Sequence, residues 1–389
     1  MQENYRDEKT VVFHGMALEA LKILPDNSVD SVVTDPPYAL TELASSKVTD
    51  ALRAWVTGDT EFIPSLGKGF MGMEWDKFVP PPALWSECFR VLKPGGFVLA
   101  FAGARTQDLM GMSIRLAGFD IKDGIGWVFS QGFPKSMNVA KETAKALEAS
   151  PENHNLNQDW SGAGTAMKPS FEPIIVAQKP ILAKNITSNI AEFGTGVFNI
   201  DATRVGSAER DSYGQPMGRW TPNFVLSHSE HCIQSGTTDD SFVRNRTEGW
   251  SGFGQEQKPR YTTEVIKFPV PVYDCVEGCA VSQLATESST KSTVQQVTSK
   301  YFPAFLYHKK AAKKEKPLLD DGSTHVSVKP LELMRWLVRL VTPVDGVVLD
   351  PFLGSGTTVE AARLEGRHSI GIEAFDSYLE LIAQRIKRS

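Results

Sequence analysis

The C-terminal part of the chain contains a short apolar run, a glycine-rich turn and a second apolar run that ends on an acid. Residues 347–350 are apolar up to Asp350, Gly354 and Gly356 follow, and Glu373 ends the next run. Glycines at a strand-to-helix turn let the backbone approach a ligand closely, and the N–H groups at the start of the helix point outward. This pattern predicts a βαβ unit, and therefore an α/β fold.

Glu373 gives the glycine-rich turn a more specific interpretation. A carboxylate at the end of the second strand can accept both ribose hydroxyls of an adenosine-containing cofactor. The turn lacks the third glycine of the dinucleotide fingerprint, because Val359 occupies that position, and it lacks the Gly-Lys-Ser/Thr ending of a phosphate-binding loop. A cofactor without a pyrophosphate fits better, and S-adenosylmethionine is the obvious one. For the two glycines alone, a purely structural turn is the alternative.

Helix-like and strand-like runs alternate over most of the chain, which favours a parallel sheet covered on both faces. Bulk properties add little to this: a length of 389 residues allows one large α/β domain and a second module. The expected helices lie at 16–24, 82–92, 331–341, 357–365 and the C-terminus, and the expected strands at 29–34, 97–101, 125–129, 174–178, 347–350 and 369–373.

Residues 194–300 differ in composition, because Gly, Ser, Thr, Asn and Gln dominate without a sustained period. We expect a loop-rich insertion there, with a mobile linker at 282–299. The predicted organisation is thus a catalytic half at 1–193, the insertion at 194–300 and a cofactor-binding half at 301–389.

Net charge and apolar patterning exclude some functions. The net charge of −5 argues against a protein that coats nucleic acid without specificity. No apolar run approaches the length of a membrane span and the N-terminus resembles no signal, so we expect a soluble, cytoplasmic protein with no membrane partner. A basic, aromatic-bearing strip at 300–316 is either a solvated helix end or a phosphate contact.

The apolar run 29–34 leads directly into the tetrapeptide Asp35-Pro36-Pro37-Tyr38. The two prolines fix the backbone just past a strand end and leave their carbonyl oxygens as rigid acceptors. Together, the Asp35 carboxylate and the Pro36 carbonyl can accept both N–H groups of an exocyclic base amine, which frees the nitrogen lone pair to attack a methyl sulfonium. Tyr38 offers an aromatic face to a base flipped out of a duplex. We interpret these four residues as catalytic, since a turn that only caps a strand explains neither the acid nor the aromatic ring.

With these motifs, the sequence resembles the DNA amino-methyltransferases that make N6-methyladenine or N4-methylcytosine. The order of its parts is similar to their permuted β group, in which the tetrapeptide comes first, then a target-recognition insertion, then the cofactor half. The phrases 166–173 and 193–201 are similar to a phage and prophage branch. The run 324–330 is similar to the family's His-x-x-x-Lys-Pro element, although Val326 stands where proline is common.

The resemblance implies a Rossmann-like, S-adenosylmethionine-dependent methyltransferase sheet. It also implies double-stranded DNA as the substrate, as in restriction-modification systems, and it leaves open whether the chain forms a homodimer. Asp35, rather than serine, before Pro-Pro-Tyr favours adenine over cytosine. The residues expected to hold the cofactor are His325, Lys329, Asp350, Phe352, Gly354, Gly356, Thr357 and Glu373.

Three of the four cysteines share a metal-ligand spacing with a histidine. His228 and Cys232 form His-x-x-x-Cys, and Cys275 and Cys279 form Cys-x-x-x-Cys. Such a set can complete a tetrahedral structural zinc site, with His231 as a competing ligand. Ordinary thiols are the alternative, because disulfides are not expected in a cytosolic chain. The fourth cysteine, Cys88, is expected in plain core packing.

Other functions remain as alternatives at this stage. N4-cytosine methylation uses the same chemistry, and methylation of a protein amide would replace Asp35 by asparagine. A catalytically silent DNA-binding module is disfavoured because the tetrapeptide, the glycines and Glu373 occur together. A nicotinamide oxidoreductase is disfavoured by the missing third glycine.

Overall fold

The computed structural model describes most of the chain. The described residues are 2–40, 43–66, 76–129, 136–206, 210, 217–229, 232–248, 260–277, 279–288, 302–305, 317, 325 and 327–389. All six lysines of the strip at 300–316 lie outside these residues, as do His231 and most of the linker expected at 282–299. Within the described part, no helix combines the length and the apolarity that a membrane crossing requires.

The described residues form a large mixed sheet of ten strands, in the order β1-β2-β12-β11-β3-β4-β6-β5-β7-β10. The central strands from β2 to β4 run parallel, and β6 is inserted antiparallel between β4 and β5. In chain order the strands are β1 Gln2–Arg6, β2 Thr10–His14, β3 Val29–Thr34, β4 Leu92–Phe101, β5 Asp120–Val128, β6 Phe171–Gln178, β7 Phe224–Ser227, β10 Ala304–Phe305, β11 Val347–Asp350 and β12 His368–Glu373.

Helices cover both faces of this sheet, because successive residues of the central strands are buried on opposite sides. Val32 and Leu349 pack with α1 to α4, whereas Val33 and Val348 pack with α9 and α10. The prediction that both faces of the sheet are covered is therefore confirmed, whereas the sheet is mixed and not purely parallel. The helices on the first face are α1 Ala17–Leu21, α2 Ser45–Val56, α3 Pro82–Val91 and α4 Gln107–Leu116; on the second face they are α9 Leu331–Val341, α10 Thr357–Leu364 and α11 Asp376–Arg388.

Strands from the two ends of the chain are neighbours at the centre of the sheet. β11 pairs in parallel with β3, with Val348 opposite Ser31 and Leu349 opposite Val32. Because parallel strands end at the same edge, the residues after β3 lie beside the residues after β11. The predicted catalytic tetrapeptide and the glycine-rich turn are thereby brought together.

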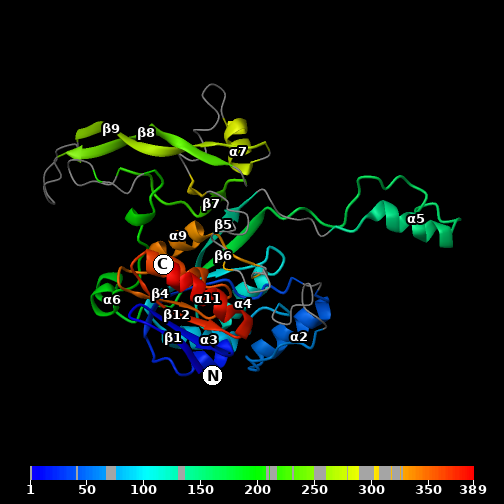
Figure 1. The fold of residues 1–389 in the computed structure, drawn as a ribbon, viewed down its shortest axis with the longest axis horizontal. Helices are drawn as coiled ribbons and strands as arrows, with labels where there is room; N and C mark the ends of the chain where they lie inside the picture. Colours follow the sequence, from blue (N-terminus) through cyan, green and yellow to red (C-terminus); the bar gives the residue numbers. More distant parts are fainter. Residues whose placement is uncertain are drawn as a thin grey trace.

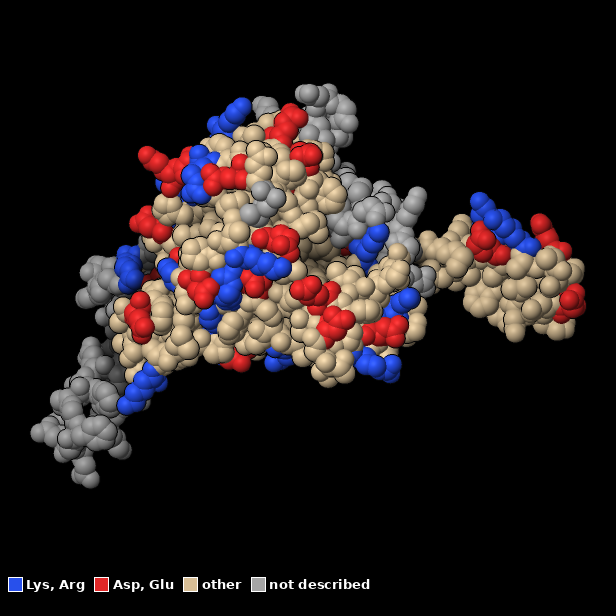
Figure 2. All heavy atoms as spheres, turned by 90° about the horizontal axis from the view of Figure 1, so that it is seen from below, with Lys and Arg blue, Asp and Glu red and all other residues tan. Residues whose placement is uncertain are grey.

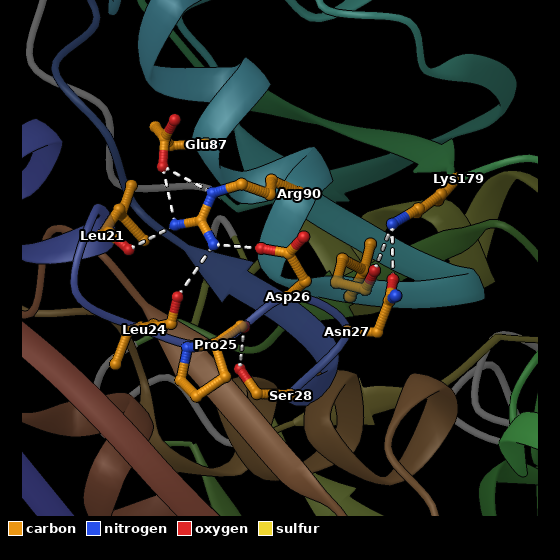
Figure 3. Close-up of polar contacts among 10 residues, drawn as sticks. Leu21, Leu24, Pro25, Asp26, Asn27, Ser28, Glu87, Arg90 and Lys179 are labelled. Atoms are coloured by element: carbon orange, nitrogen blue, oxygen red, sulfur yellow. Dashed lines mark hydrogen bonds and ion pairs between the residues drawn. The ribbon is translucent and has the colours of Figure 1, made fainter.

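The turn that leads into β3 is fixed by a network of polar contacts (Figure 3). Arg90 of α3 donates to the carbonyl oxygens of Leu21 and Leu24 at 2.8 Å each, and also to Asp26 at 2.6 Å. Lys179 donates to the side chain of Asn27 at 2.8 Å. The backbone of Asn27 lies in the left-handed region, with a φ of 51°. This network sets where β3 starts and hence where the tetrapeptide after it lies.

Two parts of the chain extend from the sheet in Figure 1. An arm that carries α5, Val139–Ala149, leaves after β5 and returns at β6, where the Phe129 N–H donates to the Ser170 carbonyl at 3.0 Å. The second part is a hairpin of β8, Ile233–Glu248, and β9, Arg260–Asp274, followed by α7, Ala280–Ser288. On the face in Figure 2, acidic and basic side chains are interspersed, and the arm projects from the main body.

The structure corrects the expectation that 194–300 is made of loops. The described part of this region contains the β8–β9 hairpin, the helix α7, the short helix η2, Asp201–Thr203, and strand β7, which pairs with β5 in the main sheet. The helix α6, Ile186–Phe193, ends just before it. In β9, Ile266, Phe268 and Val270 alternate with exposed residues, so a period of two is present after all.

Substituting Arg90 by alanine tests the network at the start of β3. The change leaves two partly buried carbonyl groups without their donor, so we expect a loss of about 2 kcal/mol of unfolding free energy. Urea unfolding measures it as a lower midpoint. Arg53→Ala, at an exposed position of α2, is the matched control and is expected to change stability by less than about 0.5 kcal/mol. Equal midpoints for the two variants would contradict a role for Arg90 in holding this turn.

Candidate active site

The tetrapeptide follows β3 at the carboxyl edge of the sheet, and the side chains of Asp76 and Thr106 hold the backbone from Tyr38 to Leu40 in place. Asp76 accepts the backbone N–H groups of Tyr38, Ala39 and Leu40 at 2.8, 3.0 and 3.0 Å. Thr106 donates its hydroxyl to the Tyr38 carbonyl at 2.6 Å. These contacts fix the turn after the two prolines, including Ala39 with its positive φ of 59°.

The Asp35 carboxylate makes contact with a phenol on one oxygen and an ammonium on the other. Tyr38 donates its hydroxyl to Oδ1 at 2.5 Å, and Lys329 Nζ lies 2.7 Å from Oδ2. Ser327 donates to Oδ2 at 3.4 Å. Burial would lower the pKa of Lys329, but the nearby carboxylates of Asp35 and Glu172 outweigh it and raise this pKa, so the lysine is a cation.

Glu172 is a site residue that the sequence analysis did not identify. Its Oε2 lies 3.3 Å from Lys329 Nζ and accepts from the Tyr38 hydroxyl at 3.3 Å. Burial raises the pKa of Glu172, and the Asp35 charge raises it further, although Lys329 opposes this effect. The signal in the sequence was an acid just after the start of an otherwise apolar run, 171–177.

Tyr38 is more enclosed than a stacking platform for a base would be. Its exposed fraction is 8%, and Lys329 Nζ lies 5.1 Å from the centre of its ring. Burial and the two neighbouring carboxylates raise the pKa of Tyr38 well above the usual value, so the phenol stays protonated and can donate. Stacking of a base on this ring therefore requires its surroundings to rearrange.

Asp350 joins the catalytic strand to the glycine-rich turn. Its Oδ1 accepts from the hydroxyl of Thr34 at 2.7 Å and from the N–H of Phe352 at 3.0 Å, and its Oδ2 accepts from Thr358 at 2.5 Å. Burial raises the pKa of Asp350 to about 6, although these hydrogen bonds oppose the shift. These contacts hold the base of the turn together, and the role of Asp350 toward a cofactor stays a prediction.

Glu373 and Gly354 face each other across the turn. Glu373 accepts from the N–H of Gly354 at 2.7 Å and from the N–H of Phe375 at 2.8 Å. Burial raises the pKa of Glu373 to about 7, and these N–H bonds oppose the shift. A carboxylate offers about four acceptor positions, so capacity for a ligand hydroxyl remains.

The two glycines of the turn serve different needs, although both have positive φ, 55° at Gly354 and 84° at Gly356. A Cβ on Gly354 would lie 3.2 Å from Nε2 of His325. A Cβ on Gly356 would instead lie 3.2 Å from the Ile382 backbone in α11. The absence of a side chain at Gly354 thus lets His325 approach the turn closely, whereas the absence of one at Gly356 allows α11 to pack against the turn.

His325 lies beside the glycine-rich turn, and Lys329 lies beside the tetrapeptide. His325 lies against Gly354, and its ring meets Tyr378 edge-on at 4.4 Å. Burial lowers the pKa of His325 to about 4, so the imidazole is neutral near neutral pH. Of the other expected residues, Phe352 is half-buried and Thr357 is buried at the start of α10.

The four residues expected to bind metal also come together, at the base of the β8–β9 hairpin. One ligand atom from each of His228, Cys232, Cys275 and Cys279 lies within 4.8 Å of the others. None of these cysteines forms a disulfide, and Cys88 is buried in the core as expected.

The chain is similar in sequence to known DNA methyltransferases. A family model described as DNA methylase, for N6 and N4 methyltransferases, matches residues 29–385. The chain is 25% identical to the Type II methyltransferase M.HindIII of Haemophilus influenzae, over 96% of this chain and 94% of that protein. A stretch of 67 residues is 42% identical to the Type II methyltransferase M.ScaI of Streptomyces caespitosus. This stretch covers 17% of this chain and 22% of that protein.

Two solved structures are similar over nearly the whole chain at low sequence identity. The cytosine-N4-specific PvuII DNA methyltransferase has a TM-score of 0.47 and 14% identity, over 99% of this chain and 88% of that chain. The complex of M1.HpyAVI with S-adenosylmethionine has a TM-score of 0.40 and 15% identity, over 97% of this chain and 99% of that chain.

The sheet and the two loops at its carboxyl edge define a Rossmann-like methyltransferase. The chain belongs to the N6/N4 DNA methylase family, whose members are S-adenosylmethionine-dependent DNA methyltransferases. The predicted family and fold class are thus confirmed. The residues present are compatible with this cofactor, because the Glu373 carboxylate beside the turn keeps acceptor capacity for hydroxyl groups and Gly354 lets His325 approach the turn closely. The phage-like branch and the homodimer stay predictions.

The raised pKa of Glu373 predicts that cofactor binding depends on pH. A protonated carboxyl loses acceptor capacity for the ribose, so affinity is expected to weaken by up to about tenfold per pH unit as pH falls below about 7, down to the pKa of the bound form. Calorimetric titration with S-adenosylhomocysteine measures it.

The Glu373→Gln variant isolates this effect, because titration of the cofactor itself is the same for both proteins. We expect weaker binding for the variant at high pH and a flatter profile. Glu148→Gln, at an exposed position of the α5 arm, is expected to follow the native profile. Parallel profiles for the native protein and Glu373→Gln would exclude Glu373 as the titrating group.

Proposed function

We propose that this chain methylates N6 of adenine in double-stranded DNA, on a base flipped out of the helix into the site beside Asp35. Methylation of DNA at an exocyclic amine follows from the family, and the choice of adenine rests on the carboxylate that precedes Pro-Pro-Tyr. The observation that carries the proposal is the position of this carboxylate. Asp35 directly follows β3. The last residue of β3, Thr34, is hydrogen-bonded through its hydroxyl to Asp350, at the start of the proposed cofactor turn.

The proposed chemistry activates a poor nucleophile. The amine nitrogen of the base shares its lone pair with the ring, so the Asp35 carboxylate and the Pro36 carbonyl accept its two N–H groups and turn the lone pair outward. The cofactor supplies an electrophilic methyl group on a sulfonium. Transfer of this methyl group, with the S–C electron pair left on sulfur, would leave an extra proton on the base nitrogen. The Asp35 carboxylate would accept that proton.

Lys329, Tyr38 and Glu172 prepare Asp35 for this role. In the structure, the Lys329 ammonium and the Tyr38 phenol both engage the Asp35 carboxylate. Each of them also reaches Glu172, at 3.3 Å. We propose that an entering amine takes over acceptor positions of Asp35, and that Lys329 and Tyr38 shift toward Glu172. The second carboxylate would thus hold the ammonium while Asp35 is in use.

We also propose that residues 194–300 recognise the target sequence, between a catalytic half at 1–193 and a cofactor half at 301–389. The β8–β9 hairpin supports this, because it extends from the sheet on the chain segment between the two halves. Its base follows β7, which pairs with β5, and β5 pairs with the strand that carries Glu172. The hairpin is therefore connected to the catalytic edge through neighbouring strands.

Asp35→Ala is expected to abolish methyl transfer and to leave cofactor affinity nearly unchanged. Asp35 acts on the base amine, whereas Glu373 holds the ribose, and loss of a positioned catalytic group costs about 10²-fold or more in rate. Transfer of labelled methyl to DNA and titration with S-adenosylhomocysteine measure the two effects. Asp120→Ala, at an exposed position of β5, is the control. An equal loss of cofactor binding would refute this division of roles.

Nucleoside analysis of methylated duplexes identifies the base. With labelled S-adenosylmethionine and duplexes of varied sequence, we expect N6-methyldeoxyadenosine as the labelled product. N4-methyldeoxycytidine as the labelled product would refute adenine as the target base and identify cytosine instead. The proposed roles of the tetrapeptide would stay the same. Intact cofactor binding with no labelled DNA in any duplex would favour the silent DNA-binding module.

A further inference from the structure

The cysteine and histidine cluster lies where four chain segments meet. His228 follows β7 directly, and Cys232 comes just before β8. Cys275 follows β9, and Cys279 comes just before α7. The four residues therefore flank the start of β8 and the end of β9, next to β7 in the outer part of the main sheet.

Two distances within the cluster match those between ligands of a tetrahedral metal centre. Zinc bonds of about 2.3 Å to sulfur and about 2.0 Å to nitrogen place a sulfur and a nitrogen ligand about 3.5 Å apart. Nδ1 of His228 lies 3.3 Å from Sγ of Cys275 and 3.7 Å from Sγ of Cys279. The same nitrogen thus faces two sulfur atoms at the separations expected of ligands to one ion.

The surroundings also suit thiolates bound to a metal. The N–H of Ser229 donates to Sγ of Cys279 at 3.5 Å, which is the kind of contact that supports a charged sulfur ligand. The His228 ring is buried and packs on Tyr273 with a centroid distance of 3.9 Å, so its orientation is fixed. Two buried thiols, one half-buried thiol and one imidazole are the ligand set of a structural Cys₃His zinc site.

Among the described residues, the apolar cluster at the base of the hairpin is small. It contains four buried residues, Leu226, Cys232, Cys279 and Val281, and two of these are ligands themselves; six partly buried side chains pack against it. Hairpins of two strands are marginally stable by themselves in water. A metal that joins His228 to Cys275, 47 residues further along the chain, would add a strong constraint at this base.

We propose that His228, Cys232, Cys275 and Cys279 bind one structural Zn²⁺ ion, which fixes the β8–β9 hairpin to β7. His228 binds through Nδ1, and each cysteine binds as a thiolate after losing its proton to solvent. The ion takes no part in methyl transfer. Its effect is on the hairpin, whose position relative to the main sheet depends on it.

Metal content and coordination test the proposal directly. Protein purified without chelator is expected to contain one zinc per chain, and Cys88→Ala, which alters the cysteine outside the cluster, is expected to keep it. Cys275→Ser and Cys279→Ser are expected to lose it. Protein reconstituted with Co²⁺ is expected to show the intense visible bands of a tetrahedral ion with sulfur ligands.

The cobalt spectrum uses the native sequence, so it decides the question even where a serine variant does not fold. Native protein that takes up neither Zn²⁺ nor Co²⁺, or that gives the weak spectrum of an octahedral oxygen site, would overturn the proposal. So would a full equivalent of zinc in a folded Cys275→Ser/Cys279→Ser double variant.

Limited proteolysis tests the consequence for the hairpin. Removing the metal with a chelator is expected to speed cleavage within 233–274 by at least about tenfold, while cleavage in the sheet strands stays slow. Cys88→Ala protein is expected to respond as the native protein does. Unchanged cleavage of the hairpin after complete metal removal would show that the ion does not hold it. S-adenosylhomocysteine binding, measured in parallel, is expected to persist.

Discussion

The active site depends on one parallel strand pair formed by the two ends of the chain. β3 and β11 are neighbours at the centre of the sheet, and a buried hydrogen bond of 2.7 Å joins Thr34 to Asp350 across a separation of 316 residues. Asp350 also holds the turn that follows it, through Phe352 and Thr358. The Asp35 carboxylate and the glycine-rich turn therefore keep their spacing because neighbouring strands end side by side, and not because they are close in sequence.

Much of this arrangement could be predicted from the sequence, because buried parallel strands leave a clear apolar pattern. The runs before Asp35 and Gly354 identified the two loops, and the cysteine spacing identified four residues that the fold brings together. Glu172 was missed for a topological reason. It lies near the start of β6, and only an antiparallel strand places its beginning at the edge where the parallel strands end.

The hairpin was missed for a different reason. β8 is polar on both sides, and β9 contains Pro269 and Pro271, which usually argue against a strand. In a hairpin of two strands, however, each strand has one edge that is not paired. A proline is tolerated where its nitrogen faces this edge, because no ladder hydrogen bond is lost there. Both prolines lie at alternate positions of the ladder, opposite Asp239 and Thr237.

The arm that carries α5 is anchored beside the candidate active site. It leaves the sheet after Phe129 and returns at Ser170, and a backbone hydrogen bond of 3.0 Å joins the two ends of the arm. Glu172 lies two residues beyond that point. The base of the arm and the contacts of Glu172 with Lys329 and Tyr38 therefore share one short stretch of backbone at the start of β6.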